Sequence, residues 1–432
     1  MRKRILAVAA AALLLLSLSA GVLAADPVTI RFYYRSGGTR PDVVRAWIAE
    51  FEAQNPDIHV EWEVAASGWQ DKLVVAMAAE TAPDVVEFWG NFAQQLARKG
   101  MLLDLRPYVA RDFTEEDISD FFPASWQNVF VQYGEYKGEQ YGLPRYINTM
   151  ANYYNKTMLD NAGLESPRSL AQRGLWNWNT LEQMARKLTR RVDGQVVQRG
   201  FMTMTRGWDR MAQWLWEAGG DWFDPNNPTR FIGDQPEAMA ALNFLHRNIW
   251  EDQIFLKDLD WNAFYNSQVA MTDDGLQVIF NNYDNAIQGK FDWDLTVRAE
   301  GPNGRKPWAT DDALGIWRGS KHPEEAWRFL KFITSKQGQE IMIRYEGLPP
   351  VRRSAASAYL KLDSRFNLAA FVESMAYAQV GITNRVAGDV AAIGTEINNA
   401  LRSSLVNNQV PPSTAMENVK RVVEAIMRET AQ

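Results

Sequence analysis

The chain contains no cysteine and only three histidines, His59, His246 and His322, among its 432 residues. The lack of cysteine excludes disulfide bonds, thiolate catalysis and zinc–thiolate sites. No two histidines have the spacing of metal ligands, so we expect each one to be structural or simply exposed. The sequence therefore predicts neither a metal site nor a cofactor.

Long hydrophobic runs are missing after the first 25 residues, so no later segment has the ~20 apolar residues that a membrane-spanning helix needs. The chain itself starts with basic residues at 2–4, an apolar run over 5–18 and small residues at 22–25. This pattern predicts a secretory signal peptide over residues 1–25. Because no cysteine follows it, a lipid anchor is not expected, and the predicted location is secreted or periplasmic.

Positive charge is also in short supply. The chain has 46 Lys and Arg against 52 Asp and Glu, a net charge of -6, and removal of the signal peptide makes it three units more negative. An acidic exported protein is a poor candidate for binding nucleic acid or an anionic membrane surface. The length that remains is too great for one core and favours two domains.

Tryptophan, in contrast, is abundant, with 17 in the chain. Large flat rings with one polar group suit protein cores, and they also suit flat, partly apolar ligands such as sugar rings. Several tryptophans fall within amphipathic helical patterns or at their ends, and for these we expect a place in the core. They are Trp214, Trp216, Trp222, Trp250 and Trp327.

The N-terminal part alternates between strand and helix patterns. Strands are predicted at 28–34, 58–64 and 85–89, and helices at 41–51, 69–80 and 91–99. This order indicates a mostly parallel sheet with helices on both faces. Ligands bind outside the C-terminal ends of such strands, where aromatic residues here stand beside polar residues or glycine. The candidate ligand contacts at these ends are Arg35, Ser36, Gly37, Trp69, Trp89 and Asn91.

The stretch 141–155 alternates in polarity and carries polar groups on both sides, which predicts an extended strand. We interpret it as a strand that leaves one lobe and enters another; an ordinary sheet strand is the alternative. Further helices are predicted at 178–188, 208–218, 236–250 and 323–333, and the region 366–430 is largely helical in pattern. Further strands are predicted at 201–205 and 314–317. The segment from Phe264 to Met271 is predicted to be a short helix that runs into a strand.

Several short pieces, taken in order, resemble the extracellular solute-binding proteins (family 1) of ABC sugar importers, the group that includes maltose-binding protein. No single piece is specific, but the ordered set covers nearly the whole mature chain. The pieces are Lys72–Val86, Tyr141–Pro144 running to Tyr153–Lys156, Ala162–Leu164, Trp176–Thr189, Ala218–Gly220, Val269–Met271, Gly319–Ser335, Gly347–Pro349 and Val351–Ser354.

The resemblance implies an α/β, two-lobed periplasmic binding protein fold (class II-like), in which each lobe is a mostly parallel sheet flanked by helices. It also implies three crossings between the lobes, near Asn148, at 310–312 and at 348–350. The expected boundaries are residues 26–148 plus 311–348 for the N-terminal lobe and residues 149–310 plus 349–432 for the C-terminal lobe.

The function that this resemblance implies is capture of a sugar or oligosaccharide by closure of the lobes, followed by delivery to the permease subunits of an ABC transporter. A monomer without catalytic activity is expected. Two alternatives stay open. An exported glycosidase could use Asp273–Asp274 and Asp311–Asp312 as acid and nucleophile, and a binder of a non-sugar polar solute, such as a peptide or polyamine, would fit the same loops.

Further candidate contacts follow from positions that match the family. Buried sugar hydroxyls need hydrogen-bonding partners, and the apolar faces of sugar rings need aromatic ones. Two departures stand out: Asn148 is an amide where the family often has an acid, and Gly275–Val278 has no aromatic where many members carry a stacking tryptophan. That platform is therefore missing or supplied by Tyr283. The candidates are Arg145, Asn148, Arg206, Trp208, Asp273, Asp274, Trp308 and Asp311.

Overall fold

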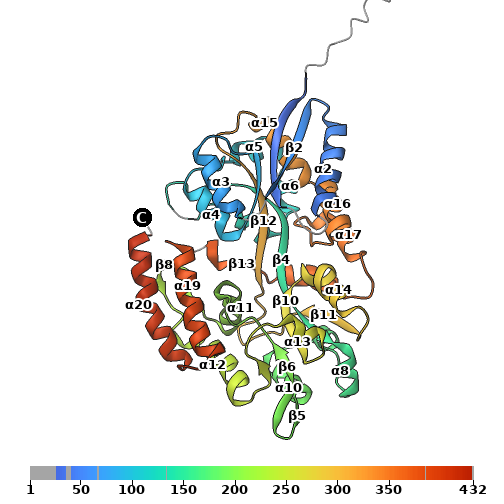
Figure 1. Ribbon diagram of the computed structural model, residues 1–432, viewed down its shortest axis with the longest axis vertical. Helices are drawn as coiled ribbons and strands as arrows, with labels where there is room; N and C mark the ends of the chain where they lie inside the picture. Colours follow the sequence, from blue (N-terminus) through green and yellow to red (C-terminus); the bar gives the residue numbers. More distant parts are fainter. Residues whose placement is uncertain (1–25, 36–39, 66–67, 133, 385, 431–432) are drawn as a thin grey trace, which may run out of the picture.

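The computed structural model describes residues 26–35, 40–65, 68–132, 134–384 and 386–430. It has two lobes, drawn one above the other in Figure 1, with strands β4 (Leu143–Asn155) and β12 (Trp308–Ile316) running between them. The predicted signal peptide and the candidates Ser36 and Gly37 lie outside the described residues.

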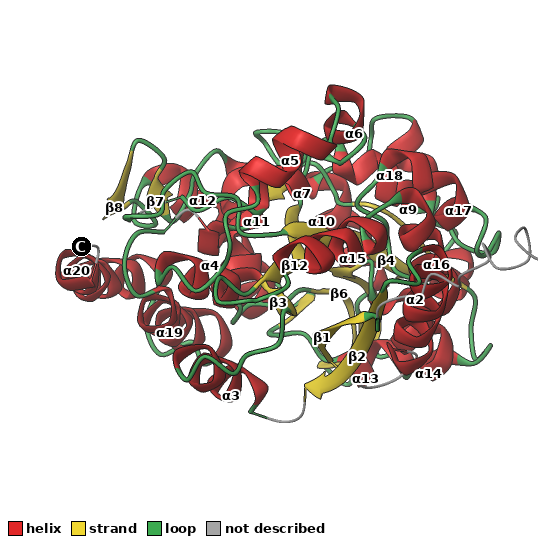
Figure 2. Ribbon diagram, turned by 90° about the horizontal axis from the view of Figure 1, so that it is seen from above, coloured by secondary structure: helices red, strands yellow, loops and turns green. Residues whose placement is uncertain are grey.

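The upper lobe begins with the predicted alternation of strands and helices. Strand β1 pairs in parallel with β2 on one side and with β3 on the other. Seen from above, the strands lie in the middle and helices cover both sides (Figure 2). The elements are β1 (Val28–Arg35), α2 (Arg40–Gln54), β2 (Ile58–Ala65), α3 (Trp69–Ala78), β3 (Val85–Trp89) and α4 (Gly90–Arg98).

The two long strands join the sheets of both lobes. Strand β12 pairs antiparallel with β3 and with β4, and β4 pairs antiparallel with β10 (Val269–Gly275) and β11 (Trp293–Val297). With β6 (Gln195–Met202) and β5 (Arg190–Val192) at its lower end, the sheet therefore runs in the order β2-β1-β3-β12-β4-β10-β6-β5. Pairing is parallel among β2, β1 and β3, and antiparallel where β12 and β4 pair with β3, with each other, and with β10 and β11.

The three segments that are predicted to cross between the lobes meet at Tyr146 of β4. Asp312 of β12 is its register partner on one side, and Pro350 forms an isolated bridge with it on the other. Asn148 of β4 faces Thr310 of β12. We propose this pair as the point at which the first two crossings change lobes.

In the lower lobe, β6 (Gln195–Met202) pairs in parallel with β10 and with the short β9 (Phe255–Leu256). Because the three strands run the same way, the segments that follow them leave from the same edge of the sheet. Strand β5 (Arg190–Val192) closes the far side as a hairpin with β6.

Several helices begin and end at capping residues that the sequence indicates. Asn177 caps α10 by accepting a hydrogen bond from Thr180 N, and Gly219 ends α11 with a φ of 94° that suits glycine. The remaining elements are α5 (Arg106–Asp112), α6 (Glu115–Ser119), α7 (Pro123–Asn128), α8 (Lys156–Asn161), α9 (Pro167–Gln172), α10 (Trp178–Leu188), α11 (Trp208–Ala218), β7 (Phe223–Asp224), β8 (Asn227–Phe231), α12 (Pro236–His246), α13 (Trp261–Tyr265), α14 (Asn285–Ile287), α15 (Pro323–Ile333), α16 (Lys336–Glu346), α17 (Ala356–Leu360), α18 (Ala369–Met375), β13 (Gln379–Val380), α19 (Val390–Leu401) and α20 (Pro412–Thr430).

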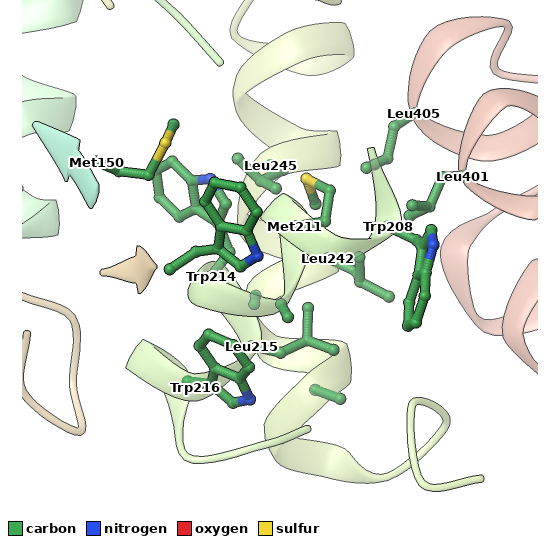
Figure 3. Packing of buried hydrophobic residues seen from close by; sticks show 14 of the residues in the cluster. Met150, Trp208, Met211, Trp214, Leu215, Trp216, Leu242, Leu245, Leu401 and Leu405 are labelled. Carbon is green, nitrogen blue, oxygen red and sulfur yellow. The ribbon is translucent and has the colours of Figure 1, made fainter. Parts of the chain in front are cut away.

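The core of the lower lobe gathers tryptophans from α11 with leucines from α12 and the C-terminal helices, as Figure 3 shows. Trp214, Trp216 and Trp222 are buried there and Trp327 is buried in the upper lobe, which confirms their predicted core role. Trp208 stands at one side of the cluster beside Leu401 and Leu405, apart from Trp214 (Figure 3).

Candidate ligand site

A cleft of about 430 Å³ lies where the two lobes meet, within the range typical of small-molecule sites. Its walls come from β1, the crossing strands β4 and β12, the start of α11, the segment after β10, and the C-terminal region. The residues that line it are Arg35, Tyr146, Asn148, Trp208, Asp209, Arg210, Gln277, Trp308, Thr310, Asp312, Thr383 and Asn398.

Two larger hollows, of about 940 and 690 Å³, lie elsewhere on the protein. Among the described residues, neither is lined by a buried side-chain polar atom that lacks a hydrogen-bond partner. The cleft between the lobes has three such atoms and contains residues from both lobes. We therefore take the smaller cleft as the candidate site.

The upper wall is held by charged side chains. Arg35, at the end of β1, donates from Nε and Nη2 to the two oxygens of Glu87, each at 2.9 Å, and also pairs with Asp312. The guanidinium is thereby fixed in orientation at the cleft surface. It can still donate to a ligand, because a guanidinium has five N–H groups.

Arg145 lies behind this wall and is fully buried. It donates to Glu346 Oε2 at 2.8 Å, and its Nη2 lies 3.3 Å from Glu87 Oε1 and 3.4 Å from Asp312 Oδ2. The ring of Tyr146 stacks on its guanidinium, with 4.6 Å to the ring centre. Arg145 therefore supports Tyr146 and Asp312 and does not line the cleft.

The lower wall is formed where α11 begins. The guanidinium of Arg210 lies 5.3 Å from the ring centre of Trp308, which is within range of a cation–π contact. Asp209 is half-buried, and burial raises the pKa of its carboxyl above the ordinary value. Within the described part of the chain this carboxylate makes no ion pair. Both residues face the cleft and are available to a polar ligand.

Three buried polar atoms of the lining have no hydrogen-bond partner within the described residues: Asn148 Oδ1, Gln277 Oε1 and Trp308 Nε1. Leaving such an atom unpaired costs about 1–3 kcal/mol. Two are acceptors and one is a donor, so a ligand that carries hydroxyl groups can satisfy all three. The arrangement therefore favours a polyhydroxylated ligand.

Glycine at position 275 makes this arrangement possible. A Cβ at Gly275 would lie 2.0 Å from Gln277 Oε1 and 2.6 Å from Asn148 Oδ1. Any side chain there would push one or both amides away from their present positions. The absence of a side chain thus allows two cleft acceptors to sit close together.

Asp273 and Asp274, at the end of β10, are each only 1% exposed and do not line the cleft. Asp273 pairs with Arg298 and accepts from Gln213 Nε2 at 3.3 Å. Asp274 accepts from Trp261 Nε1 at 2.7 Å, and burial raises the pKa of its carboxyl. Both carboxylates are used within the lower lobe.

Other candidates are also placed away from the cleft lining. Trp69 is buried in the upper lobe, with its ring edge-on to Phe92 at 5.2 Å between ring centres. Arg206 is exposed and pairs with Asp258. Tyr283 is fully buried, so its ring supplies no platform at the cleft. The side chains of Trp89, Asn91 and Asp311 lie outside the described part of the structure.

The structure thus brings four candidates together around one cleft: Arg35, Asn148, Trp208 and Trp308. The remaining lining residues were not among the candidate ligand contacts, and Asp312 was named only as a carboxylate of the glycosidase alternative. Asp209 and Arg210 could have been found, because they directly follow Trp208 at a predicted helix start. Thr383 and Asn398 carry no local signal. The full set of additions is Tyr146, Asp209, Arg210, Gln277, Thr310, Asp312, Thr383 and Asn398.

The described residues hold neither a metal-binding cluster nor a membrane-spanning helix. They contain no group of three or more His, Asp or Glu side chains arranged to hold a metal ion. None of the helices in this part of the chain combines the length and the apolar character needed to cross a bilayer.

Comparisons with known proteins agree with this architecture. The model of the family described as bacterial extracellular solute-binding protein matches residues 37–340. A putative binding protein of Brucella abortus is 24% identical over 339 residues, which are 74% of this chain and 75% of the relative. A multiple sugar-binding protein of Streptococcus mutans is 23% identical over 352 residues, which are 75% of this chain and 75% of the relative.

Two solved structures show the same fold. An ABC substrate-binding protein of Listeria monocytogenes, in complex with cycloalternan, aligns with a TM-score of 0.76 and 25% identity over 93% of this chain and 100% of that chain. The sugar-binding protein MalE of Xanthomonas citri aligns with a TM-score of 0.78 and 22% identity over 93% of this chain and 98% of its own. The predicted two-lobed α/β fold is confirmed.

Proposed function

The chain belongs to the bacterial extracellular solute-binding protein family, and from that premise we propose that it captures a sugar or oligosaccharide in the cleft and delivers it to the permease of an ABC importer. The observation that carries this proposal is the set of unpaired polar atoms of Asn148, Gln277 and Trp308 in a cleft also lined by aromatic rings. Hydroxyl groups of a sugar can pair with these atoms while its apolar ring face packs on an indole.

Capture by closure is supported by the origin of the lining. Arg35 comes from the first strand of the upper lobe and Arg210 from a helix of the lower lobe, and between them lie the crossing strands. A ligand that contacts both walls gains those contacts only when the walls are close together. It therefore shifts the population of the protein toward the closed form.

The proposal includes export, because the sequence begins with a predicted signal peptide and the family is extracellular. It also includes an oligosaccharide as the preferred ligand class. Support for this choice comes from relatives such as a maltotriose-binding protein of Pyrococcus abyssi, which is 23% identical over 68% of this chain and 59% of the relative.

The glycosidase alternative is disfavoured because the carboxylates that would catalyse the reaction are engaged by other side chains of the protein. Hydrolysis of a glycosidic bond needs two carboxyl groups that flank the bond and reach the substrate. Asp273 is paired with Arg298, Asp274 is bound by Trp261 and Tyr283, and Asp312 is paired with Arg35. We therefore propose a binder without catalytic activity.

The test is a thermal-shift screen of the purified mature chain against mono- and oligosaccharides, followed by calorimetric titration of any hit. A ligand bound by the native state alone raises the midpoint of unfolding, by an amount that grows with its concentration. Stoichiometric binding of an unchanged carbohydrate is expected. The proposal fails if only peptides or polyamines raise the midpoint, or if the oligosaccharide is recovered as shorter products.

A further inference from the structure

Trp261 differs from the other tryptophans whose side chains the structure describes. It is the exposed one, with 41% of its surface accessible, whereas the others are buried or half-buried. A single exposed apolar residue is ordinary on a protein surface. What sets Trp261 apart is the way in which its ring is held.

The indole N–H of Trp261 donates to Asp274 Oδ2 at 2.7 Å. The hydroxyl of Tyr283 donates to the same oxygen at 3.2 Å, and Gly275 N donates to Oδ1 at 2.7 Å. Asp274 is 1% exposed, and burying a carboxylate is costly unless donors surround it. An exposed indole could bond to water instead, so this anchor fixes the orientation of the ring.

The anchor places Trp261 at the edge of the lower lobe that faces the cleft. It is the first residue of α13, which follows β9 in the chain. Helix α13 packs beside β10, and both are labelled in the lower lobe of Figure 1. Strands β9, β6 and β10 are parallel, so the segments after all three leave from one edge. The segment after β6 leads to Asp209 and Arg210, and the segment after β10 leads to Gln277, all of which line the cleft.

Two further links connect the anchor to the cleft. Gly275, which directly follows Asp274, lies against the amides of Asn148 and Gln277. Burial raises the pKa of Asp274, and the positive charge of Arg210, which lines the cleft, opposes this rise. Trp261 is therefore held by a carboxylate that lies immediately behind the cleft lining.

We propose that Trp261 is the aromatic platform of a second subsite, on the rim of the lower lobe, that binds a sugar ring extending out of the cleft. The inference rests on the proposed function and narrows its ligand to an oligosaccharide of two or more rings. A rim site suits this chemistry, because the ring face packs on the indole while the hydroxyls on the other side stay in water.

The test compares calorimetric titrations of a monosaccharide and of the longer oligosaccharide that binds the wild-type chain. Trp261→Gln keeps an N–H donor for Asp274 but removes the aromatic face. We expect it to weaken oligosaccharide binding about tenfold, because the apolar face of the outer sugar ring loses the indole on which it packs, and to leave monosaccharide binding within about twofold. Trp261→Phe keeps a ring but loses the N–H donor. Its affinity for the oligosaccharide should therefore lie between those of the wild type and Trp261→Gln.

Tyr345→Ala is the matched control, because Tyr345 is a 39% exposed aromatic on α16, outside the cleft lining. It should leave both affinities unchanged. Unaltered oligosaccharide binding in Trp261→Gln, or an equal loss for the monosaccharide, would overturn the rim subsite. A wild-type chain that gains no affinity from added rings would do the same. A wild-type chain that binds no carbohydrate would instead overturn the proposed function.

Discussion

Five ionised side chains meet at and behind the upper wall of the cleft. Two are guanidiniums and three are carboxylates, and Arg145 at the centre touches all three acids. Such a cluster contributes little net stability when it is complete, but it becomes costly when one member is removed, because the remaining charges stay buried. The members are Arg35, Glu87, Arg145, Asp312 and Glu346.

Removing the central cation should therefore be severe. We expect Arg145→Met to lower the free energy of unfolding by about 3–5 kcal/mol, because three carboxylates lose their shared partner. Urea unfolding at neutral pH measures this. The control is Arg173→Met, which breaks an exposed pair with Glu165 and should cost about 1 kcal/mol or less. Equal stability of the two variants would contradict the role assigned to the cluster.

Asn148 combines burial with an unpaired acceptor, so its contribution should appear in binding. Asn148→Ala removes an acceptor that we expect a ligand hydroxyl to use, which corresponds to a loss of about three- to tenfold in affinity. Titration calorimetry with the carbohydrate identified by screening gives the value. Asn226→Ala, at an exposed position, should bind like the wild type. An Asn148→Ala variant with full affinity would place the ligand elsewhere.

Asp209 should influence how stability depends on pH. Burial raises the pKa of its carboxyl, so the folded chain holds this proton more tightly than the unfolded chain does. Between the ordinary Asp pKa of about 3.9 and the raised folded value, the contribution of this group to stability falls as the pH rises. Asp209→Asn removes the contribution. Its unfolding midpoint should decline less than that of the wild type as the pH is raised from about 4, and a parallel decline would contradict this.

At the level of secondary structure, the sequence predicts best where local chemistry decides. The helices at 178–188, 208–218 and 323–333 have the predicted bounds, because capping residues, a proline or a glycine mark their ends. Strand β12 was predicted only at 314–317 but begins at Trp308. Ala309, Asp311 and Asp312 have low strand propensity, and the pairing of this segment with β4 stabilises the extended conformation that the local sequence does not favour.

In the candidate site, too, the sequence predicts best those residues whose position depends on local chemistry. Arg35 was found because strand ends can be read locally, and the rule for strand ends gave the correct edge. Trp208 was found from a position that matches the family. Asp273 and Asp274 also stand at a strand end, but the burial that removes them from the cleft depends on Arg298 and Trp261, which are distant in sequence. Thr383 reaches the cleft only through tertiary packing, which no spacing predicts.

The end of β10 offers a test of the cleft geometry. Gly275→Ala places a methyl group where the amides of Asn148 and Gln277 now lie. Those side chains can rotate away, so we expect a small change in unfolding midpoint but a loss of about tenfold or more in ligand affinity, since two hydrogen bonds are displaced. Thermal unfolding and calorimetry separate the two effects.

Gly194→Ala is the control for this substitution. Gly194 has a φ of 79° and open space around its Cβ position, so alanine there strains the backbone of the β5–β6 turn without reaching the cleft. It should lower stability and leave affinity unchanged. If Gly275→Ala behaved in the same way, the two amides would not contact the ligand.

For the whole molecule, the three crossing segments lie side by side, and this arrangement determines where the junction between the lobes is expected to bend. Tyr146 lies between Asp312 and Pro350 in the pairing, and its ring covers Arg145, which binds Glu346 just before the third crossing. The strands are thereby held as one unit on the upper side of the junction. Bending is then expected beyond this unit, where Asn148 faces Thr310, at the floor of the cleft.

This arrangement predicts a change of shape upon binding. A saturating carbohydrate should reduce the radius of gyration measured by small-angle X-ray scattering, because a ligand that contacts both walls favours the closed form. Asn148→Ala should need more ligand to reach the same final value, since a weaker ligand shifts the same two-state equilibrium at higher concentration. A radius that stays constant at saturation would mean that the lobes do not close around the ligand, and the capture mechanism would have to be abandoned.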